Sequence, residues 1–176
     1  MFEVLVFVYE NYWQGDHCPE LEHLGRKLSA HGFDDDEIDQ ALHWLDGLSQ
    51  ATQGVQIDKL AADGSAATIT VHSDADDNML APSADAMRVY TVAEQDQLGA
   101  ACLGFISFLE SARALPPRMR EIAIDRAMAA PTAVGEPVAL DEFKIIVLMV
   151  YWSTGVEPDA LVLDELCDQD AGRVAH

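Results

Sequence analysis

The feature that most constrains the fold of this chain is a run of apolar residues near its C-terminal end. Residues 145–152 read IIVLMVYW, and no charged side chain lies between Lys144 and Glu157. A helix that is apolar on every side has to be covered on every side, so this segment is expected to form the central helix of a bundle. Gly155 follows it and predicts its end, because glycine readily takes the left-handed conformation that stops helices.

Proline residues and a capping pair divide the C-terminal half of the chain into further helices. Thr91 and Glu94 have the T-x-x-E spacing of a capping box, which predicts the start of a helix. Pro116 and Pro117 end that helix and begin the next one, because proline is well accommodated in a first helical turn. We therefore expect a four-helix bundle in residues 92–176, with helices at about 92–115, 117–130, 141–154 and 158–169.

The opening thirteen residues, MFEVLVFVYENYW, are rich in strand-favouring types but have the spacing of a helix. Glu3, Glu10 and Gln14 fall on one stripe of a helix, whereas they would fall on two opposite faces of a strand. The apolar run from Val4 to Tyr9 is six residues long, against the ~20 that a membrane-spanning helix needs. A targeting signal is not expected either, because there is no basic segment and no small-residue cleavage site. The stretch is predicted to be a buried helix.

Two more helices and a β-hairpin are expected before residue 92. Pro19 and the acidic run from Asp34 to Glu37 mark helix starts, because proline and acidic residues are favoured in first turns. β-branched residues predict strands at about 67–72 and 87–91, with a shorter one near 55–57. The chain is thus expected to be mainly α, and residues 1–91 to form a winged-helix-like trihelical unit with a β-hairpin. Its helices are predicted at about 2–14, 19–31 and 35–50.

The charge of the chain is strongly unbalanced. There are 31 Asp and Glu residues against 10 Lys and Arg, which gives a formal net charge of −21. Such a field repels the phosphates of nucleic acid and anionic membrane surfaces, and it attracts basic partners. The expected partner is therefore a basic protein. Nucleic acid is disfavoured except through a small local contact, and no membrane association is expected.

No recognisable catalytic motif occurs in the sequence. His17, Cys18, His23 and His31 are the nearest approach to a metal cluster, but a zinc site needs a second pair of ligands to complete its tetrahedron. Glu20 and His23 have the Glu-x-x-His spacing of a di-iron site, which needs a second copy of that motif. We expect no metal, no cofactor and no enzymatic activity.

The cysteines give an indication of the compartment. Cys18, Cys102 and Cys167 are far apart and odd in number. They are interpreted as reduced thiols packed as small apolar groups. Reduced thiols are typical of a cytoplasmic protein.

Two features are candidates for partner binding. Trp44 lies one residue off the apolar face of its predicted helix, and an exposed tryptophan is a typical anchor for a protein partner; the alternative is packing at the edge of the trihelical core. The second feature is an arginine cluster that would meet a phosphate or an acidic partner, unless it pairs with the protein's own carboxylates. The cluster consists of Arg113, Arg118, Arg120 and Arg126, with Arg88 at the edge of the expected hairpin.

Six separated blocks resemble, in order, the bacterial Smg family: MFEVLVFVYENYW, HGFDDDEIDQALHWLDGL, RVYTVAEQDQL, GFISFLE, REIAIDRAMA and LDEFKIIVLMV. The resemblance covers nearly the full chain. It implies a small cytoplasmic protein without an established biochemical activity. It also implies at most a loose association with DNA metabolism, because the family takes its name from being encoded beside the DNA-processing protein Smf. The matching motif positions are Arg88, Tyr90, Thr91, Glu94, Gly104, Glu110, Arg120, Glu121, Arg126 and Lys144.

The chain departs from the family pattern in three places. Leu103 stands where the resemblance implies an arginine, Ile145 where it implies a tryptophan, and Tyr-Trp-Ser-Thr-Gly follows Val150 in place of a Pro-Gly turn. No catalytic or binding residues are implied by the resemblance. The sequence therefore favours a non-enzymatic interaction or regulatory module. The alternatives are a nucleic-acid-binding regulator that uses the arginine cluster and, least favoured, an enzyme.

Overall fold

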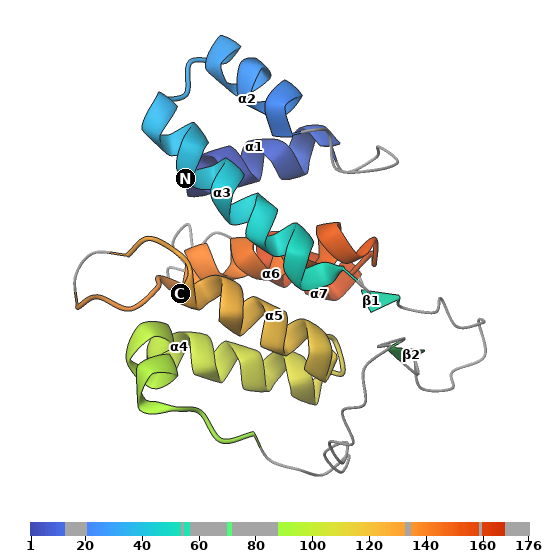
Figure 1. The fold of residues 1–176 in the computed structure, drawn as a ribbon. Helices are drawn as coiled ribbons and strands as arrows, with labels where there is room; N and C mark the ends of the chain where they lie inside the picture. Colours follow the sequence, from blue (N-terminus) through green and yellow to red (C-terminus); the bar gives the residue numbers. More distant parts are fainter. Residues whose placement is uncertain are drawn as a thin grey trace, which may run out of the picture.

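The computed structural model describes residues 1–12, 21–53, 55–56, 70–71, 88–132, 135–158 and 160–167. These residues form seven helices and two very short strands (Figure 1). The mainly helical fold class predicted from the sequence is confirmed. The helices are α1 (Phe2–Tyr12), α2 (Leu21–Ala30), α3 (Asp35–Thr52), α4 (Val92–Ser111), α5 (Pro117–Met128), α6 (Leu140–Thr154) and α7 (Ala160–Cys167), and the strands are β1 (Val55–Gln56) and β2 (Thr70–Val71).

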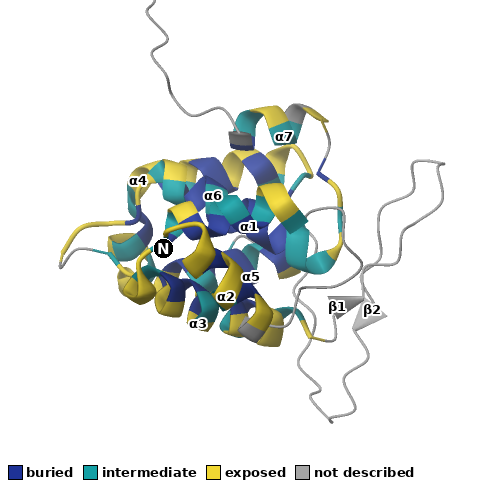
Figure 2. Ribbon diagram, turned by 90° about the horizontal axis from the view of Figure 1, so that it is seen from above, coloured by how far each residue is buried: buried dark blue, intermediate teal, exposed yellow. Residues whose placement is uncertain are grey.

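Helix α6 is the centre of the fold. Every residue from Ile146 to Tyr151 is at most 8% exposed, and α6 packs against α1, α3, α4, α5 and α7. Figure 2 shows buried residues gathered where these helices face one another. The expectation that the apolar run forms a central helix is confirmed. None of the described helices is long and apolar enough to cross a membrane.

The N-terminal helices share this core with the C-terminal ones. Val4, Leu5 and Val8 of α1 are fully buried, while Glu3 and Glu10 are exposed, as the helical spacing predicts. Helix α1 packs against α3 and α6, and α3 packs against α5 and α6. A single cluster of buried side chains therefore runs through both halves of the chain. The proposed domain boundary at residue 91 stays a prediction.

The predicted β-hairpin is not found between the segments that were expected to form it. Strand β2 lies within the expected 67–72 strand but pairs antiparallel with β1, with Val55 opposite Val71. Residues 88–91 are neither strand nor helix, so a winged helix with that hairpin is not supported. The reason is that this segment leads into α4: Arg88 binds carboxylates of α4 and α5, and Thr91 caps α4. Residues 67–69, 72 and 87 lie outside the described residues.

Helix α4 is interrupted by a kink that was not predicted from the sequence. Gly99 has φ 63° and ψ 174° inside it, a conformation that is essentially restricted to glycine. At the kink, the carbonyl of Gln97 accepts a hydrogen bond of 2.8 Å from the N–H of Val138, and a Cβ at Gly99 would lie 3.3 Å from Pro137. The segment before α6 therefore crosses α4 at this point.

Candidate functional site

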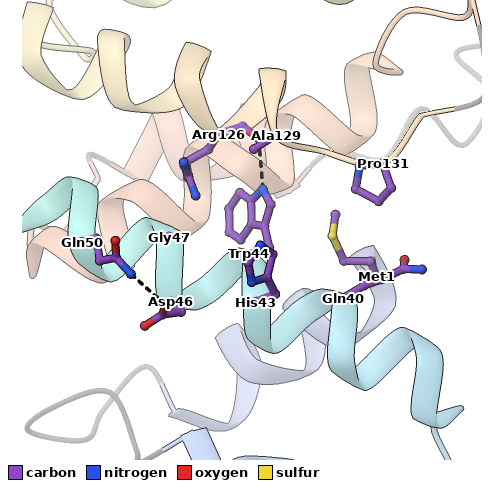
Figure 3. Close-up of a pocket in the computed structure, with 10 residues that line it drawn as sticks. All are labelled: Met1, Gln40, His43, Trp44, Asp46, Gly47, Gln50, Arg126, Ala129 and Pro131. Carbon is purple, nitrogen blue, oxygen red and sulfur yellow. Dashed lines mark hydrogen bonds between the residues drawn. The ribbon is translucent and has the colours of Figure 1, made fainter.

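A pocket of about 370 Å³ opens between α3 and α5, beside the N-terminal residue (Figure 3). It brings together Trp44 and Arg126, two of the six residues that the sequence marks as candidates for partner binding. Its other lining residues come from the start of the chain, from α3 and from the segment that follows α5. They are Met1, Gln40, His43, Asp46, Gly47, Gln50, Ala129 and Pro131.

Trp44 forms one wall of the pocket and at the same time joins two helices. Its side chain projects from α3 toward α5 (Figure 3), is 3% exposed, and its indole N–H donates a 3.0 Å hydrogen bond to the main-chain carbonyl of Arg126. The N–H of Ala130 binds the carbonyl of Ala127 instead, so Trp44 satisfies a carbonyl in the last turn of α5, where no helical partner is present. Trp44 is therefore not an exposed anchor. It packs at the edge of the core, which is the alternative to partner binding that the sequence left open.

Arg126 reaches across α3 at a residue without a side chain. A Cβ on Gly47 would lie 1.9 Å from Nη1 of Arg126, so glycine is what allows the guanidinium to lie there. Nη2 of Arg126 is 2.7 Å from Oδ2 of Asp125. The charge of Arg126 is thus balanced by its chain neighbour, and its side chain is 14% exposed.

The rim of the pocket belongs to an acidic helix. Gln40, His43, Asp46 and Gln50 are exposed, and Gln50 donates a 2.7 Å hydrogen bond to Asp46. Helix α3 contains no lysine or arginine. Its acidic residues are Asp35, Asp36, Glu37, Asp39 and Asp46. The pocket therefore opens on a surface that carries negative charge and attracts cations.

A second cluster of charged groups ties the start of α4 to α5. Nη2 of Arg88 lies 2.7 Å from Oε1 of Glu94 and 2.9 Å from Oε2 of Glu121. Arg120 bridges Glu121, at 2.7 Å, and Glu110. These five groups come from three separate stretches of the chain. They make Arg88 and Arg120 parts of an internal ion-pair network.

The network sets the protonation of its members. Hydrogen bonding by Arg88 holds the pKa of Glu94 at about 2, against its ordinary 4.5. The guanidinium of Arg88 also stacks over the ring of Tyr90, with Cζ 4.6 Å from the ring centre, and burial raises the pKa of Tyr90. Thr91 and Glu94 form the predicted capping box. The sequence identified Arg88 and Glu94 as motif positions, but it did not predict that Arg88 forms ion pairs with Glu94 and Glu121.

The predicted arginine cluster is divided by the structure. Arg120 and Arg126 pair with carboxylates of their own helices or of α4, which is the alternative that the sequence left open. Arg113 and Arg118 are exposed and make no ion pair within the described part of the chain. They flank the turn between α4 and α5, where Arg113 has φ 56°.

The remaining candidates show no reactive arrangement. No group of three or more His, Cys, Asp or Glu residues that could hold a metal occurs among the residues searched, namely those that the structure describes. His17, Cys18 and Glu20 lie outside them. Cys102 is fully buried, its Sγ contacts the carbonyl of Val138 at 3.4 Å, and burial raises its pKa to about 11.

The residues of the site that sequence reasoning missed are mostly small or polar. Gly47 could have been recognised from the sequence. A glycine inside a helical pattern costs about 1 kcal/mol relative to alanine and usually has a packing reason. Gln40 and Gln50 could not be identified in this way, because any exposed helix face carries such residues.

The fold and the site define a small, acidic, mainly helical protein with a pocket of side-chain size between two of its helices. The family model described as "Protein of unknown function (DUF494)" matches residues 1–176. The chain is 50% identical to the "Protein Smg homolog" of Methylibium petroleiphilum and to that of Leptothrix cholodnii, each over 176 residues and the full length of both chains. It is 44% identical to the homolog of Bordetella avium over 177 residues, again at full coverage. The chain belongs to this family, the bacterial Smg proteins. No solved structure matches it significantly.

Proposed function

We propose that this Smg-family protein is a non-enzymatic interaction module that binds a basic segment of a protein partner at the pocket between α3 and α5. The observation that carries the proposal is a pocket with an aromatic wall that opens on a helix with acidic residues and no basic ones. A lysine or arginine side chain of the partner would pack its apolar stem along the exposed rim of α3 and place its charge near Asp46.

The size and charge of the pocket support a single inserted side chain. A volume of about 370 Å³ is near the small end of the range for ligand sites. Arg126 would repel an incoming cation, but its charge is balanced by Asp125 at 2.7 Å. The exposed acids of α3 add long-range attraction, which raises association rates with a basic partner.

Nucleic acid as the direct ligand is less well supported. Arg88, Arg120 and Arg126 pair with carboxylates of the protein, which leaves Arg113 and Arg118 as the exposed members of the predicted cluster. Two arginines on a protein of net charge −21 offer few phosphate contacts. A link to DNA metabolism would then run through the partner, since proteins that bind nucleic acid are commonly basic.

The test is affinity capture from a lysate of the protein's own host, divided into nuclease-treated and untreated halves. We expect a basic protein that survives nuclease, is captured less as salt rises, and is lost with Asp46→Lys. Asp164→Lys is the matched control, because Asp164 is an exposed acid on α7, outside the pocket lining. Capture that disappears with nuclease, or that Asp46→Lys leaves unchanged, would overturn the proposal.

A direct measurement places the contact. In a titration with the purified partner, the indole N–H of Trp44 is expected to shift in the NMR spectrum, because it is bonded to Arg126 at the wall of the pocket. The indole N–H of Trp152, which points to the carbonyl of Tyr12 at 3.4 Å, serves as the internal reference.

A further inference from the structure

Arg126 places a guanidinium group of the protein itself in the candidate pocket. The residue lines the pocket, and Figure 3 shows its side chain extending from α5 toward Gly47 of α3, beside Trp44. A Cβ on Gly47 would overlap Nη1 of Arg126 and lie 3.0 Å from its Cζ. The guanidinium group therefore occupies the space that a side chain at residue 47 would take. We call this space, between Gly47 and Asp125, the guanidinium site.

Few interactions hold the Arg126 side chain in the guanidinium site. Its Nε and Nη2 donate hydrogen bonds of 3.0 and 2.7 Å to Oδ2 of Asp125. Within the described part of the chain, no hydrogen bond joins the guanidinium group to α3. Asp125 is the preceding residue in the sequence, and its side chain is 61% exposed. An ion pair with so exposed a carboxylate contributes little to stability, so its exchange for an equivalent ion pair costs little.

The other paired arginines are held more firmly. Arg88 binds Glu94 and Glu121, which come from two different helices. Arg120 likewise binds Glu121 of its own helix and Glu110 of α4. Each of these two side chains joins separate parts of the fold, whereas the side chain of Arg126 pairs only with its chain neighbour among the described residues. Arg126 is therefore the arginine that an incoming cation replaces at the smallest cost.

The main chain at Arg126 is fixed independently of its side chain. The indole N–H of Trp44 donates a 3.0 Å hydrogen bond to the carbonyl of Arg126. The guanidinium group can therefore move into solvent while the wall of the pocket stays in place. Its departure leaves the backbone of Gly47 uncovered and Asp125 without its cation. The vacated guanidinium site has the shape and the charge for a second guanidinium group.

We propose that Arg126 is an internal occupant of the guanidinium site and that an arginine side chain of the partner displaces it. The inference rests on the proposed function and narrows the bound group from a basic side chain to arginine. The incoming guanidinium lies against Gly47 and pairs with Asp125, while Asp46 remains at the rim. Lysine fits less well, because its ammonium is compact and strongly hydrated, whereas guanidinium is planar and weakly hydrated.

The test is an NMR titration of the full chain with Nα-acetyl-argininamide, followed by the indole N–H of Trp44. Nα-acetyl-lysinamide is the comparison, and concentrations from about 0.1 to about 50 mM detect millimolar dissociation constants. Arg126→Ala should raise the affinity for the arginine amide by about tenfold, which is the gain for a site that is free about one-tenth of the time. The gain for the lysine amide should be smaller.

A second substitution separates displacement from charge. Arg126→Ala also removes a positive charge, which by itself favours any cation. Gly47→Ala fills the guanidinium site without a change of charge, so Arg126→Ala/Gly47→Ala should lose the gain in affinity. Arg126→Ala/Gly104→Ala is the matched control and should keep it, because a Cβ on Gly104 meets nothing within 4 Å. Circular dichroism checks that every variant is folded.

Several results would overturn displacement of Arg126. One is an affinity for the arginine amide that Arg126→Ala leaves unchanged or lowers, and another is a gain that persists in Arg126→Ala/Gly47→Ala. Inorganic phosphate that shifts the Trp44 signal of the wild type, but not of Arg126→Ala, would assign Arg126 to an anion instead. An absence of any shift with either amide in all variants would also count against it. The proposed function is judged separately, by whether Asp46→Lys abolishes capture of the basic partner.

Discussion

The indole N–H of Trp44 and the main-chain carbonyl of Arg126 are joined by a 3.0 Å hydrogen bond between residues 82 positions apart in the chain. This bond connects the middle of α3 to the last turn of α5. It makes one aromatic side chain both a wall of the pocket and a cap for a helix carbonyl. The integrity of the pocket is therefore coupled to the packing of these two helices.

Trp44→Phe should lower the free energy of unfolding by about 1–3 kcal/mol, because it leaves the partly buried carbonyl of Arg126 without a donor. The measurement is urea unfolding followed by circular dichroism. Trp152→Phe is the matched control: its hydrogen bond to the carbonyl of Tyr12 is longer, at 3.4 Å, so it should cost less. Equal costs for the two variants would contradict this role of Trp44.

Gly47→Ala should have different effects on stability in two backgrounds. With Arg126 present, the new Cβ would lie 1.9 Å from Nη1 and force the guanidinium out, which offsets the gain in helix propensity. With Arg126→Ala, the guanidinium is absent and Gly47→Ala should stabilise α3 by about 1 kcal/mol. A double-mutant cycle by chemical unfolding measures the difference, and identical effects in both backgrounds would show that the two residues are not coupled.

Acid should destabilise the protein partly through Glu94. Hydrogen bonding by Arg88 lowers the pKa of Glu94 to about 2 from 4.5. A carboxyl group whose pKa is lower in the folded state contributes stability above its unfolded pKa, and that contribution is lost as pH falls toward the folded pKa. Between pH 4.5 and about 2, the unfolding free energy of Glu94→Gln should therefore fall less steeply than that of the wild type. Parallel curves from urea unfolding over this range would rule out the assignment.

Two glycines of α4 should respond to alanine in opposite directions. Gly99→Ala places a side chain at φ 63° and 3.3 Å from Pro137, and a residue held in such a conformation costs about 1–3 kcal/mol. Gly104→Ala meets nothing within 4 Å and should stabilise the helix by up to about 1 kcal/mol. Thermal unfolding at low protein concentration checks both, and a stabilising Gly99→Ala would mean that the kink is absent in solution.

The helices could be predicted from the sequence because their signals are local. The apolar run at 145–152 and the capping box at Thr91 each depend on residues a few positions apart. The kink at Gly99 depends instead on a hydrogen bond between Gln97 and Val138, which no local pattern reveals. The strand expected at 87–91 failed for a similar reason: its β-favouring residues are compatible with any extended backbone, and a long-range ion pair from Arg88 to Glu121 holds the segment in place.

The candidate site could be predicted only as a set of positions. The arginines were identified correctly as a local excess of positive charge, but their roles depend on which carboxylates approach them in space. Glu121 forms ion pairs with both Arg88 and Arg120. Because Arg88 and Glu121 are far apart in the sequence, their ion pair could not be predicted from a local pattern. Trp44 was placed at the edge of an apolar face, and whether such a residue is exposed depends on α5, which covers it.

The position of α6 has a consequence for how the chain is made. Helix α1 packs against a helix that begins at residue 140, so α1 leaves the ribosome well before that helix has been made. At about 5–20 residues per second, synthesis of the intervening chain takes roughly seven to thirty seconds. During that interval Val4, Leu5 and Val8 lack part of the surface that covers them in the finished molecule. The nascent chain therefore carries a partly uncovered apolar face on α1, of the kind that chaperones bind, until α6 completes the core.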